Sequence, residues 1–284
     1  MKEFFGIDVT RDKNSETLNC QSFLSRQPSP AHISALESAA AALEGLNTKA
    51  KLPKVFLIFY YIVYIGTFTI LIGLLRGLGK VTIQQAYANA PWLFYLAAGF
   101  LVAWAVMALW KNRRASGVTS GEEFQAAVRR AEAAAESCLA TMAIPDNAPK
   151  VDVMSCRYTE KNGKVKYMTA GVNARYANPE VRIFAENGAL HLADTTHCYA
   201  IPLSEIRCLR RINKSVWIAG WNKELSFREG RYKPYKLTSN QYGNVAVKPY
   251  YALEILHNGE AYALHFPSYE LPVFEAFTGL TATE

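Results

Sequence analysis

The chain has 284 residues, enough for one large or two ordinary domains. It carries 31 Lys and Arg against 24 Asp and Glu, and this modest net charge of +7 argues against a nucleic-acid-binding protein. Five cysteines, an odd number without tight paired spacing, favour reduced thiols in a cytosolic compartment over a disulfide framework. The mean hydropathy near zero conceals two very apolar stretches in an otherwise soluble-looking sequence.

The first 51 residues are expected to form an N-terminal cytoplasmic segment with one alanine-rich helix at about 30–46. No apolar run lies near Met1, which argues against a signal peptide. Ser29 is a suitable N-cap with Pro30 at the first helical position, and Gly45 can end the helix. One face of this helix carries an apolar stripe formed by Ile33, Leu36, Ala40 and Leu43.

Two transmembrane helices are predicted at 52–76 and 91–110, joined by an external loop at 77–90. Residues 55–75 and 91–110 contain no charged residue, and twenty helical residues rise about 30 Å, the thickness of a bilayer's hydrocarbon core. The buried helices of soluble proteins rarely run so far without a charge. Without Asp, Glu, Lys, Arg or His in these stretches, an anchor is favoured over a transporter. Small residues that permit close helix contact are Gly73, Gly77, Gly99 and Ala103.

The cations that flank the two spans predict the orientation of this hairpin. Six of them lie on the terminal sides of the spans, whereas only Arg76, at the end of the first span, and Lys80, in the connecting loop, lie on the other side. The positive-inside rule therefore places both termini in the cytoplasm of a multi-pass protein of the cell membrane. The predicted contacts of the lipid head groups are these cations and one aromatic residue: Lys49, Lys51, Lys54, Trp110, Lys111, Arg113 and Arg114.

Residues 111–149 are predicted to contain the basic flank, a second alanine-rich helix at about 120–143, and a linker. Ser120 and Glu123 form a capping-box pattern at the start of this helix. Its apolar stripe can pack antiparallel against the first alanine-rich helix, either as an ordinary helix pair or as a stalk that joins copies into a homo-oligomer. The stripe consists of Phe124, Val128, Ala131, Ala135, Cys138 and Met142.

A mainly β domain is expected at 150–284, because the apolar pattern becomes alternating there. Three Asn-Gly pairs, which begin at Asn162, Asn187 and Asn258, predict hairpins with type I′ turns. Alternation then places Leu264 on the buried face and His265 on the polar face. The predicted pairs are Tyr158–Tyr167, Cys156–Thr169, Ile183–Leu192, Ala185–Leu190, Tyr251–Phe266, Leu253–Leu264, Ile255–Tyr262 and His257–Glu260.

About seven antiparallel strands are expected, followed by a capping helix from about Ser268 to Gly279. The domain contains VRIFAENGALHLADTTHCYAIPLSEIRCLRR and later YALEILHNGEAYALHFPSYELPVFEAFTGL. This succession of a hairpin, a strand leading into IPLSEI, and a closing hairpin that runs into a helix resembles the bacterial pleckstrin-homology-like (PH-like) and GRAM-like domains. The resemblance covers about the final 110 residues, apart from a long insertion at 222–249. It implies a binding or scaffold module without enzymatic activity.

No catalytic or cofactor motif emerges from the sequence. GLGKVT at 77–82 lacks the first glycine and the Ser or Thr of a phosphate-binding loop. His191, His197 and Cys198 come nearest to a metal site but lack the spacing of zinc ligands. We therefore expect no cofactor, no metal and no catalytic residue.

A second cationic cluster consists of Arg207, Arg210, Arg211 and Lys214. It is either a solvated strand end or a patch that docks on anionic lipid or an acidic membrane-protein partner. Alternation along the strand places Arg210 and Arg211 on opposite faces. The favoured function is a non-catalytic membrane protein that presents a cytoplasmic PH-like domain at the bilayer surface. The alternatives are an accessory subunit of a larger membrane transporter or enzyme complex, and a membrane-bound enzyme.

Overall fold

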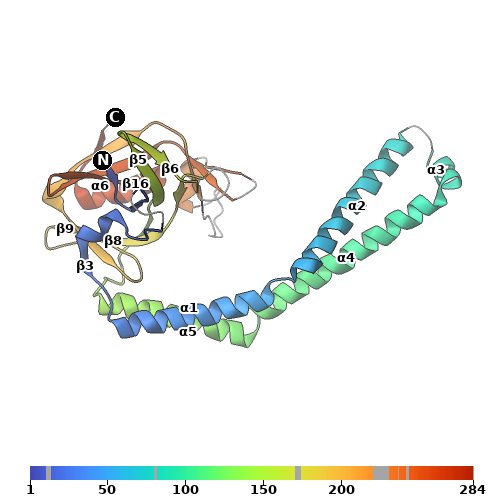
Figure 1. Cartoon of the computed structure of the whole chain (residues 1–284), viewed down its shortest axis with the longest axis horizontal. Helices are drawn as coiled ribbons and strands as arrows, with labels where there is room; N and C mark the ends of the chain where they lie inside the picture. Colours follow the sequence, from blue (N-terminus) through green and yellow to red (C-terminus); the bar gives the residue numbers. More distant parts are fainter. Residues whose placement is uncertain are drawn as a thin grey trace. The chain divides into compact units, whose positions relative to one another are not determined.

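The computed structural model describes residues 1–10, 14–79, 82–169, 174–219, 230–235, 237–240 and 243–283. The chain divides into two compact units (Figure 1). The β unit comprises Met1–Ile33 and Glu136–Glu284, and the helical unit comprises Ser34–Ala135. The N-terminal residues therefore fold with the C-terminal half of the chain, although the whole helical unit lies between them in the sequence.

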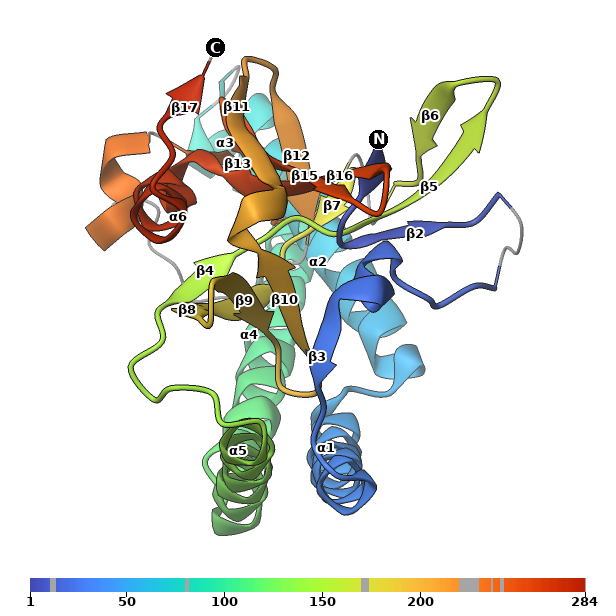
Figure 2. The ribbon, with the colours of Figure 1, turned by 90° about the vertical axis from the view of Figure 1, so that its left-hand side faces the viewer.

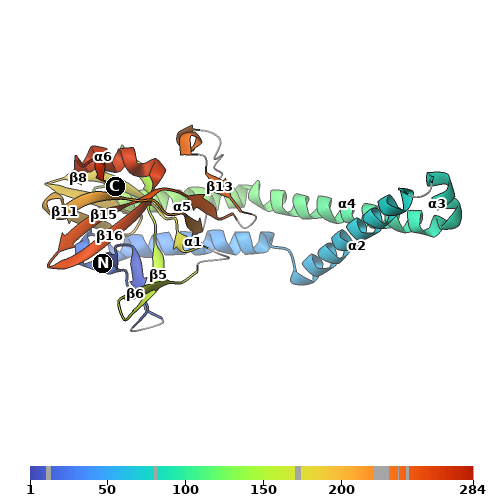
Figure 3. The same cartoon turned by 90° about the horizontal axis from the view of Figure 1, so that it is seen from above.

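Five helices form the helical unit and its connections to the β unit. They are α1 (Pro30–Ala50), α2 (Lys54–Leu78), α3 (Ile83–Asn89), α4 (Pro91–Thr119) and α5 (Glu122–Thr141). The α2 and α4 helices run side by side, with α3 at one end of the pair (Figures 1 and 3). Two helical segments, Lys54–Gly77 and Pro91–Thr119, are long and apolar enough to cross a membrane. The predicted pair of long apolar helices is thus present.

The ends of the helices differ from those expected. The α1 helix continues through Gly45 to Ala50, and α4 continues through the basic flank to Thr119. The second alanine-rich helix, α5, begins at Glu122 instead of at about Ser120, and the Ser120 hydroxyl donates a hydrogen bond to the carbonyl of Ser116 in α4. The expected loop contains α3, whose start is held by a capping box between Thr82 and Gln85.

A close contact between α2 and α4 occurs at Gly66, near the middle of α2. A Cβ atom at this position would lie 2.5 Å from Cε1 of Phe100, so only glycine fits without a shift. Beside it, the hydroxyl of Thr67 lies 3.3 Å from the carbonyl oxygen of Phe100 and can donate a hydrogen bond across the helix pair. Open space surrounds the glycines that the sequence indicated for this contact, Gly73, Gly77 and Gly99.

The described part of the β unit forms four sheets of mostly short strands (Figure 2). The first contains, in spatial order, β1 (Lys2–Glu3), β16 (Glu260–Pro267), β15 (Tyr250–His257), β11 (Ile206–Ile212) and β17 (Ala282–Thr283). The second contains β3 (Leu24–Arg26), β10 (Cys198–Pro202), β9 (Ala189–Ala193), β8 (Glu180–Glu186) and β4 (Lys150–Asp152).

Two smaller sheets complete the β unit. One contains β13 (Thr238–Ser239), β14 (Val245–Val247), β12 (Val216–Ala219) and β7 (Tyr176–Ala177), and the other contains β2 (Gly6–Asp8), β5 (Cys156–Lys161) and β6 (Lys164–Tyr167). Short 3₁₀ segments lie at Asn19–Phe23, Leu203–Glu205, Gly230–Tyr235 and Ser268–Glu270. The described strands outnumber the seven expected, because strands of two or three residues are too short to show alternation.

The registers predicted for the hairpins at Asn187 and Asn258 are confirmed at every predicted pair. Both asparagines have positive φ, 50° and 49°, as a type I′ turn requires. The hairpin at Asn162 pairs Tyr158 with Tyr167 as expected. Its strand β6 ends at Tyr167, however, so the ladder stops before the predicted pair Cys156–Thr169, and Cys156 pairs with Gly6 of β2 on the other side of β5.

The first 33 residues supply three strands that the sequence did not indicate. The β1 strand pairs parallel with β16, β2 pairs parallel with β5, and β3 pairs antiparallel with β10. Phe4, Phe5 and Phe23 from this segment are buried in the main core of the β unit. The predicted domain at 150–284 is therefore only part of the β unit, and its strands are not all antiparallel.

The predicted C-terminal helix is present as α6 (Leu271–Thr278), which follows β16 directly after a 3₁₀ turn. Its Phe274 stacks on Phe266 of β16 with ring centroids 3.9 Å apart. Gly279 ends the helix in the left-handed region at φ 68°. The surrounding core also includes the fully buried Ile183, Leu190, Leu192, Leu253 and Leu264.

Candidate functional site

Most apolar side chains of α2 and α4 lie on the outside of the helical unit. Only 6% of the most apolar window of each helix is buried. The helices of a soluble core bury such side chains, whereas Ile65 and Leu75 are 61% and 67% exposed. A surface of this kind needs an apolar solvent or a partner to cover it. Other large exposed side chains on it are Val55, Ile58, Phe59, Ile62, Val102, Val106 and Leu109.

Aromatic residues gather at both ends of the α2–α4 pair. At one end, Phe56 contacts Trp110 with ring centroids 4.5 Å apart. At the other end, the hydroxyls of Tyr87 and Tyr95 lie 2.7 Å apart, and Trp92 is exposed. Trp92 and Trp110 are separated by about 27 Å along α4, close to the thickness of a bilayer's hydrocarbon core. Two aromatic groups at this spacing are typical of a span with one group at each membrane interface.

Cations accompany the aromatic group at the first of these ends. The Lys111 ammonium lies 5.1 Å from the ring centroid of Tyr60, and the Arg114 guanidinium lies 5.5 Å from that of Trp110. We call Phe56, Tyr60, Trp110, Lys111 and Arg114 the interface cluster. The sequence indicated three of its members, but Phe56 and Tyr60 join only through contacts between the two helices.

The other predicted head-group residues are not members of the interface cluster. Lys51, Lys54 and Arg113 are exposed. Lys54 begins α2, so it lies within one turn of Phe56, while Arg113 lies between Lys111 and Arg114 in α4. The side chain of Lys49 and the whole of Lys80 lie outside the described residues.

The second cationic cluster does not form one patch on the β unit. Arg207 lies at a bulge in β11, where the register with β15 shifts. Arg210 and Arg211 are neighbours in a regular part of the strand and so point to opposite faces, as expected. Arg210 forms an ion pair with Glu254 of β15, which compensates its charge. Lys214 follows the strand and is exposed.

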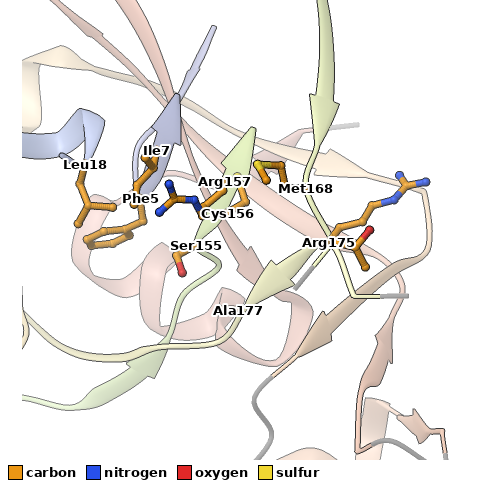
Figure 4. Close-up of a pocket in the computed structure, with 10 residues that line it drawn as sticks. Phe5, Ile7, Leu18, Ser155, Cys156, Arg157, Met168, Arg175 and Ala177 are labelled. Atoms are coloured by element: carbon orange, nitrogen blue, oxygen red, sulfur yellow. The ribbon is translucent and has the colours of Figure 1, made fainter. Parts of the chain in front are cut away.

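A small pocket of about 270 Å³ lies among β2, β5 and β7 of the β unit (Figure 4). Its wall is mainly apolar, with Phe5, Ile7 and Met168 around the buried Cys156. Burial raises the pKa of the Cys156 thiol, so this group stays protonated and is a poor nucleophile. The Arg157 guanidinium donates a hydrogen bond to the carbonyl of Ser15 at 3.0 Å. The pocket is slightly smaller than the roughly 300 Å³ at which pockets for small molecules begin.

A buried polar cluster fixes β1 to neighbouring strands. The carboxylate of Glu3 accepts a hydrogen bond from the Tyr167 hydroxyl at 2.7 Å, and its other oxygen lies 2.6 Å from Nδ1 of His265. The Tyr176 hydroxyl also donates to Glu3, at 3.4 Å. His265 is only 7% exposed. The expectation of an open polar face at His265 was therefore wrong: its register was correct, but Glu3 of β1 and the ring of Tyr176 from β7 pack against His265 on that face.

The residues that came nearest to a metal site are only partly brought together. Sγ of Cys198 and Nδ1 of His191 lie 3.6 Å apart and both residues are buried, whereas His197 lies beside Asp194. Burial raises the pKa of Cys198 and lowers that of His191, so both groups are held neutral. Among the residues that the structure describes, no group of three His, Cys, Asp or Glu is placed to hold a metal ion.

Comparison with known proteins finds no matching family model, no similar curated protein and no similar solved structure.

Proposed function

We propose that this chain is a non-catalytic membrane protein whose α2–α4 pair spans the cell membrane and holds the β unit at the cytoplasmic surface. In this proposal the β unit is a PH-like binding or scaffold module. The bilayer is the immediate partner, and an anionic lipid or a membrane protein is the expected ligand of the module.

The exposed apolar surface of α2 and α4 is the observation that carries the proposal. Helices of this hydropathy can belong to the core of a soluble protein, but core helices are mostly buried. Here 6% of each apolar window is buried, and the aromatic groups lie about 27 Å apart along α4. Both facts support a surface whose solvent is lipid.

The orientation rests on charge, and the PH-like assignment rests on the C-terminal elements. Six cations on the terminal sides of the spans against two in the connection favour cytoplasmic termini. The β15–β16 hairpin runs directly into α6, which agrees with the closing hairpin and helix of the PH-like pattern. The three N-terminal strands and the parallel pairs β1–β16 and β2–β5 go beyond that pattern.

Cysteine labelling in intact cells tests this topology. A cysteine replaces Gln85 of α3, and a second variant carries a cysteine in place of Thr283 in β17. A membrane-impermeant maleimide should label Gln85→Cys in intact cells and Thr283→Cys only after lysis. If only Thr283→Cys is labelled in intact cells, the orientation of the chain is the reverse of the one proposed. If the unmodified chain is recovered in the soluble fraction, α2 and α4 do not anchor it in a membrane.

A hollow at the α3 end of the helix pair favours the accessory-subunit alternative. About 500 Å³ of space opens among α2, α3 and α4, lined by Gly73, Gly77, Ala90, Leu93 and Phe94. Small residues facing such a space would allow a further transmembrane helix to approach. Purification of the full chain in mild detergent decides this point. A stoichiometric membrane protein that co-purifies, and is lost in Gly73→Leu/Gly77→Leu, would favour the accessory subunit over the scaffold.

A further inference from the structure

The outer edge of β6 is open in the part of the chain that the structure describes. Its sheet has the order β2, β5, β6, and the β5–β6 hairpin projects from the β unit (Figure 2). The amide of Met168, just after β6, donates a hydrogen bond to the Arg157 carbonyl of β5 at 2.8 Å. Because the direction of the backbone groups alternates along a strand, those of Val165 and Tyr167 point away from β5. Their N–H and C=O groups can therefore pair with one further strand.

Three lysines lie on one face of this hairpin. Lys161 and Lys164 are directly opposite each other across β5 and β6, and Lys166 lies two residues further along the same face. All three are exposed, and none forms an ion pair with a residue that the structure describes. Like charges at directly opposite positions destabilise a strand pair. A carboxylate placed beside them would relieve this repulsion, but Glu160 of the same hairpin lies on the other face.

The other face of β6 carries an exposed apolar side chain. Val165 is 39% exposed and points to the face opposite to that of Lys164 and Lys166. A strand added at this edge would meet lysines on one face and valine on the other. A second copy of β6 would bring lysines of its own to the same edge and would be repelled. The edge is therefore complementary to a strand in which acidic and apolar residues alternate.

We infer that the outer edge of β6 binds an extended segment of a partner protein in which acidic residues alternate with apolar ones. The backbone of this segment pairs with Val165 and Tyr167, and its carboxylates lie beside Lys164 and Lys166. The inference deepens the proposed function, on which it rests only in that the β unit is a binding module, because it names the class of partner. It is independent of the orientation in the membrane.

Peptide binding to the full chain in a neutral detergent tests the charge pattern. Fluorescence anisotropy should detect binding of a labelled Glu-Val-Glu-Val-Glu peptide. Lys164→Glu/Lys166→Glu turns two cross-strand attractions into repulsions, so it should weaken this binding about tenfold and favour a Lys-Val-Lys-Val-Lys peptide instead. Arg207→Glu/Lys214→Glu reverses the same number of exposed charges elsewhere on the β unit and should leave both affinities unchanged.

Removal of backbone donors tests the strand pairing. Val165→Pro deletes an N–H that points away from β5, a position at which an edge strand tolerates proline, and should abolish binding. An N-methylated Glu-Val-Glu-Val-Glu peptide keeps every charge but cannot pair, so it should not bind the unmodified chain. The inference is overturned if the unmodified chain binds neither acidic peptide, or if Arg207→Glu/Lys214→Glu causes an equal loss. Equal binding of the N-methylated peptide also overturns it, because the lysines would then attract any acidic surface, a bilayer included. These outcomes are separate from the cysteine labelling, which tests the membrane topology.

Discussion

The two units of this protein place the same kind of side chain in opposite environments. In the β unit, Leu253 and Leu264 are fully buried, because strands of several sheets and α6 enclose a common core. In the helical unit, Ile65 and Leu75 are more than 60% exposed, because each of two paired helices can cover only one side of the other. Hydropathy alone does not distinguish the apolar residues of a core from those of a bilayer-facing surface. The fraction of apolar side chains that the fold itself buries distinguishes them.

The largest effect is expected from charges placed on the exposed face of α2. Ile62→Asp/Ile65→Asp should raise the free energy of membrane insertion by about 6 kcal/mol, since each Asp near a span's centre costs about 3 kcal/mol. The fraction of the chain that resists alkaline extraction from membranes measures this effect. Val165→Asp/Met168→Asp, at exposed apolar positions of the β unit, should remain fully membrane-bound. If the double variant in α2 stays inserted and folded, a protein partner rather than lipid covers this face.

Within the β unit, the corresponding change at a buried position should strongly lower the free energy of unfolding. Leu264→Asp places an unpaired carboxylate in the main core and should cost about 5 kcal/mol of unfolding free energy. Leu256→Asp, on the neighbouring strand but 37% exposed, should change it by about 0.5 kcal/mol or less. Urea unfolding of the detergent-solubilised chain, followed by near-ultraviolet circular dichroism, compares the two. Equal losses would contradict the observed register.

The sequence predicted those features whose signal is local. The two apolar helices follow from uncharged runs, and the Asn187 and Asn258 hairpins follow from a turn dipeptide between alternating strands. The β1 strand escaped prediction because two residues show no period, and its partner β16 lies at the other end of the chain. The sequence predicted only part of the interface cluster, because Phe56 and Tyr60 belong to it through contacts between α2 and α4.

The buried polar cluster around Glu3 provides a third test, because its face was expected to be open. His265→Asp places a second carboxylate beside Glu3 inside the β unit and should lower the unfolding free energy by about 3–4 kcal/mol. His265→Gln can still donate a hydrogen bond to Glu3 and should lose less than half as much. The same urea titration measures both. A mild effect of His265→Asp would mean that Glu3 and Tyr176 do not pack against this side chain.

The contact between α2 and α4 should respond to small changes of volume. Gly66→Ala brings a methyl group to within 2.5 Å of the Phe100 ring, and the overpacking should destabilise the helix pair by about 1–3 kcal/mol. Gly73→Ala meets no atom within 4 Å and should be neutral or slightly stabilising. Hydrogen exchange of the α2 amides in detergent micelles, read by mass spectrometry, should therefore speed up in the first variant and not in the second.

The smallest effect is expected at Arg210, where the structure weakens the case for a docking patch. Its ion pair with Glu254 joins side chains that are 44% and 21% exposed, so water screens the attraction. A double-mutant cycle of Arg210→Ala and Glu254→Ala should give a coupling of about 0.2–1 kcal/mol in urea unfolding. The coupling should fall further in 0.5 M salt.

The docking hypothesis predicts a different result for Glu254→Ala. If Arg210 binds an anionic partner, removal of the Glu254 carboxylate should make its guanidinium more available to that partner. If Glu254→Ala leaves the unfolding free energy unchanged and increases the binding of the β unit to anionic bilayers, Arg210 belongs to a docking surface and Glu254 weakens its binding. If Glu254→Ala lowers the unfolding free energy by the coupling energy and leaves binding to anionic bilayers unchanged, Arg210 is a solvated strand residue. Lipid contact is then confined to the helical unit.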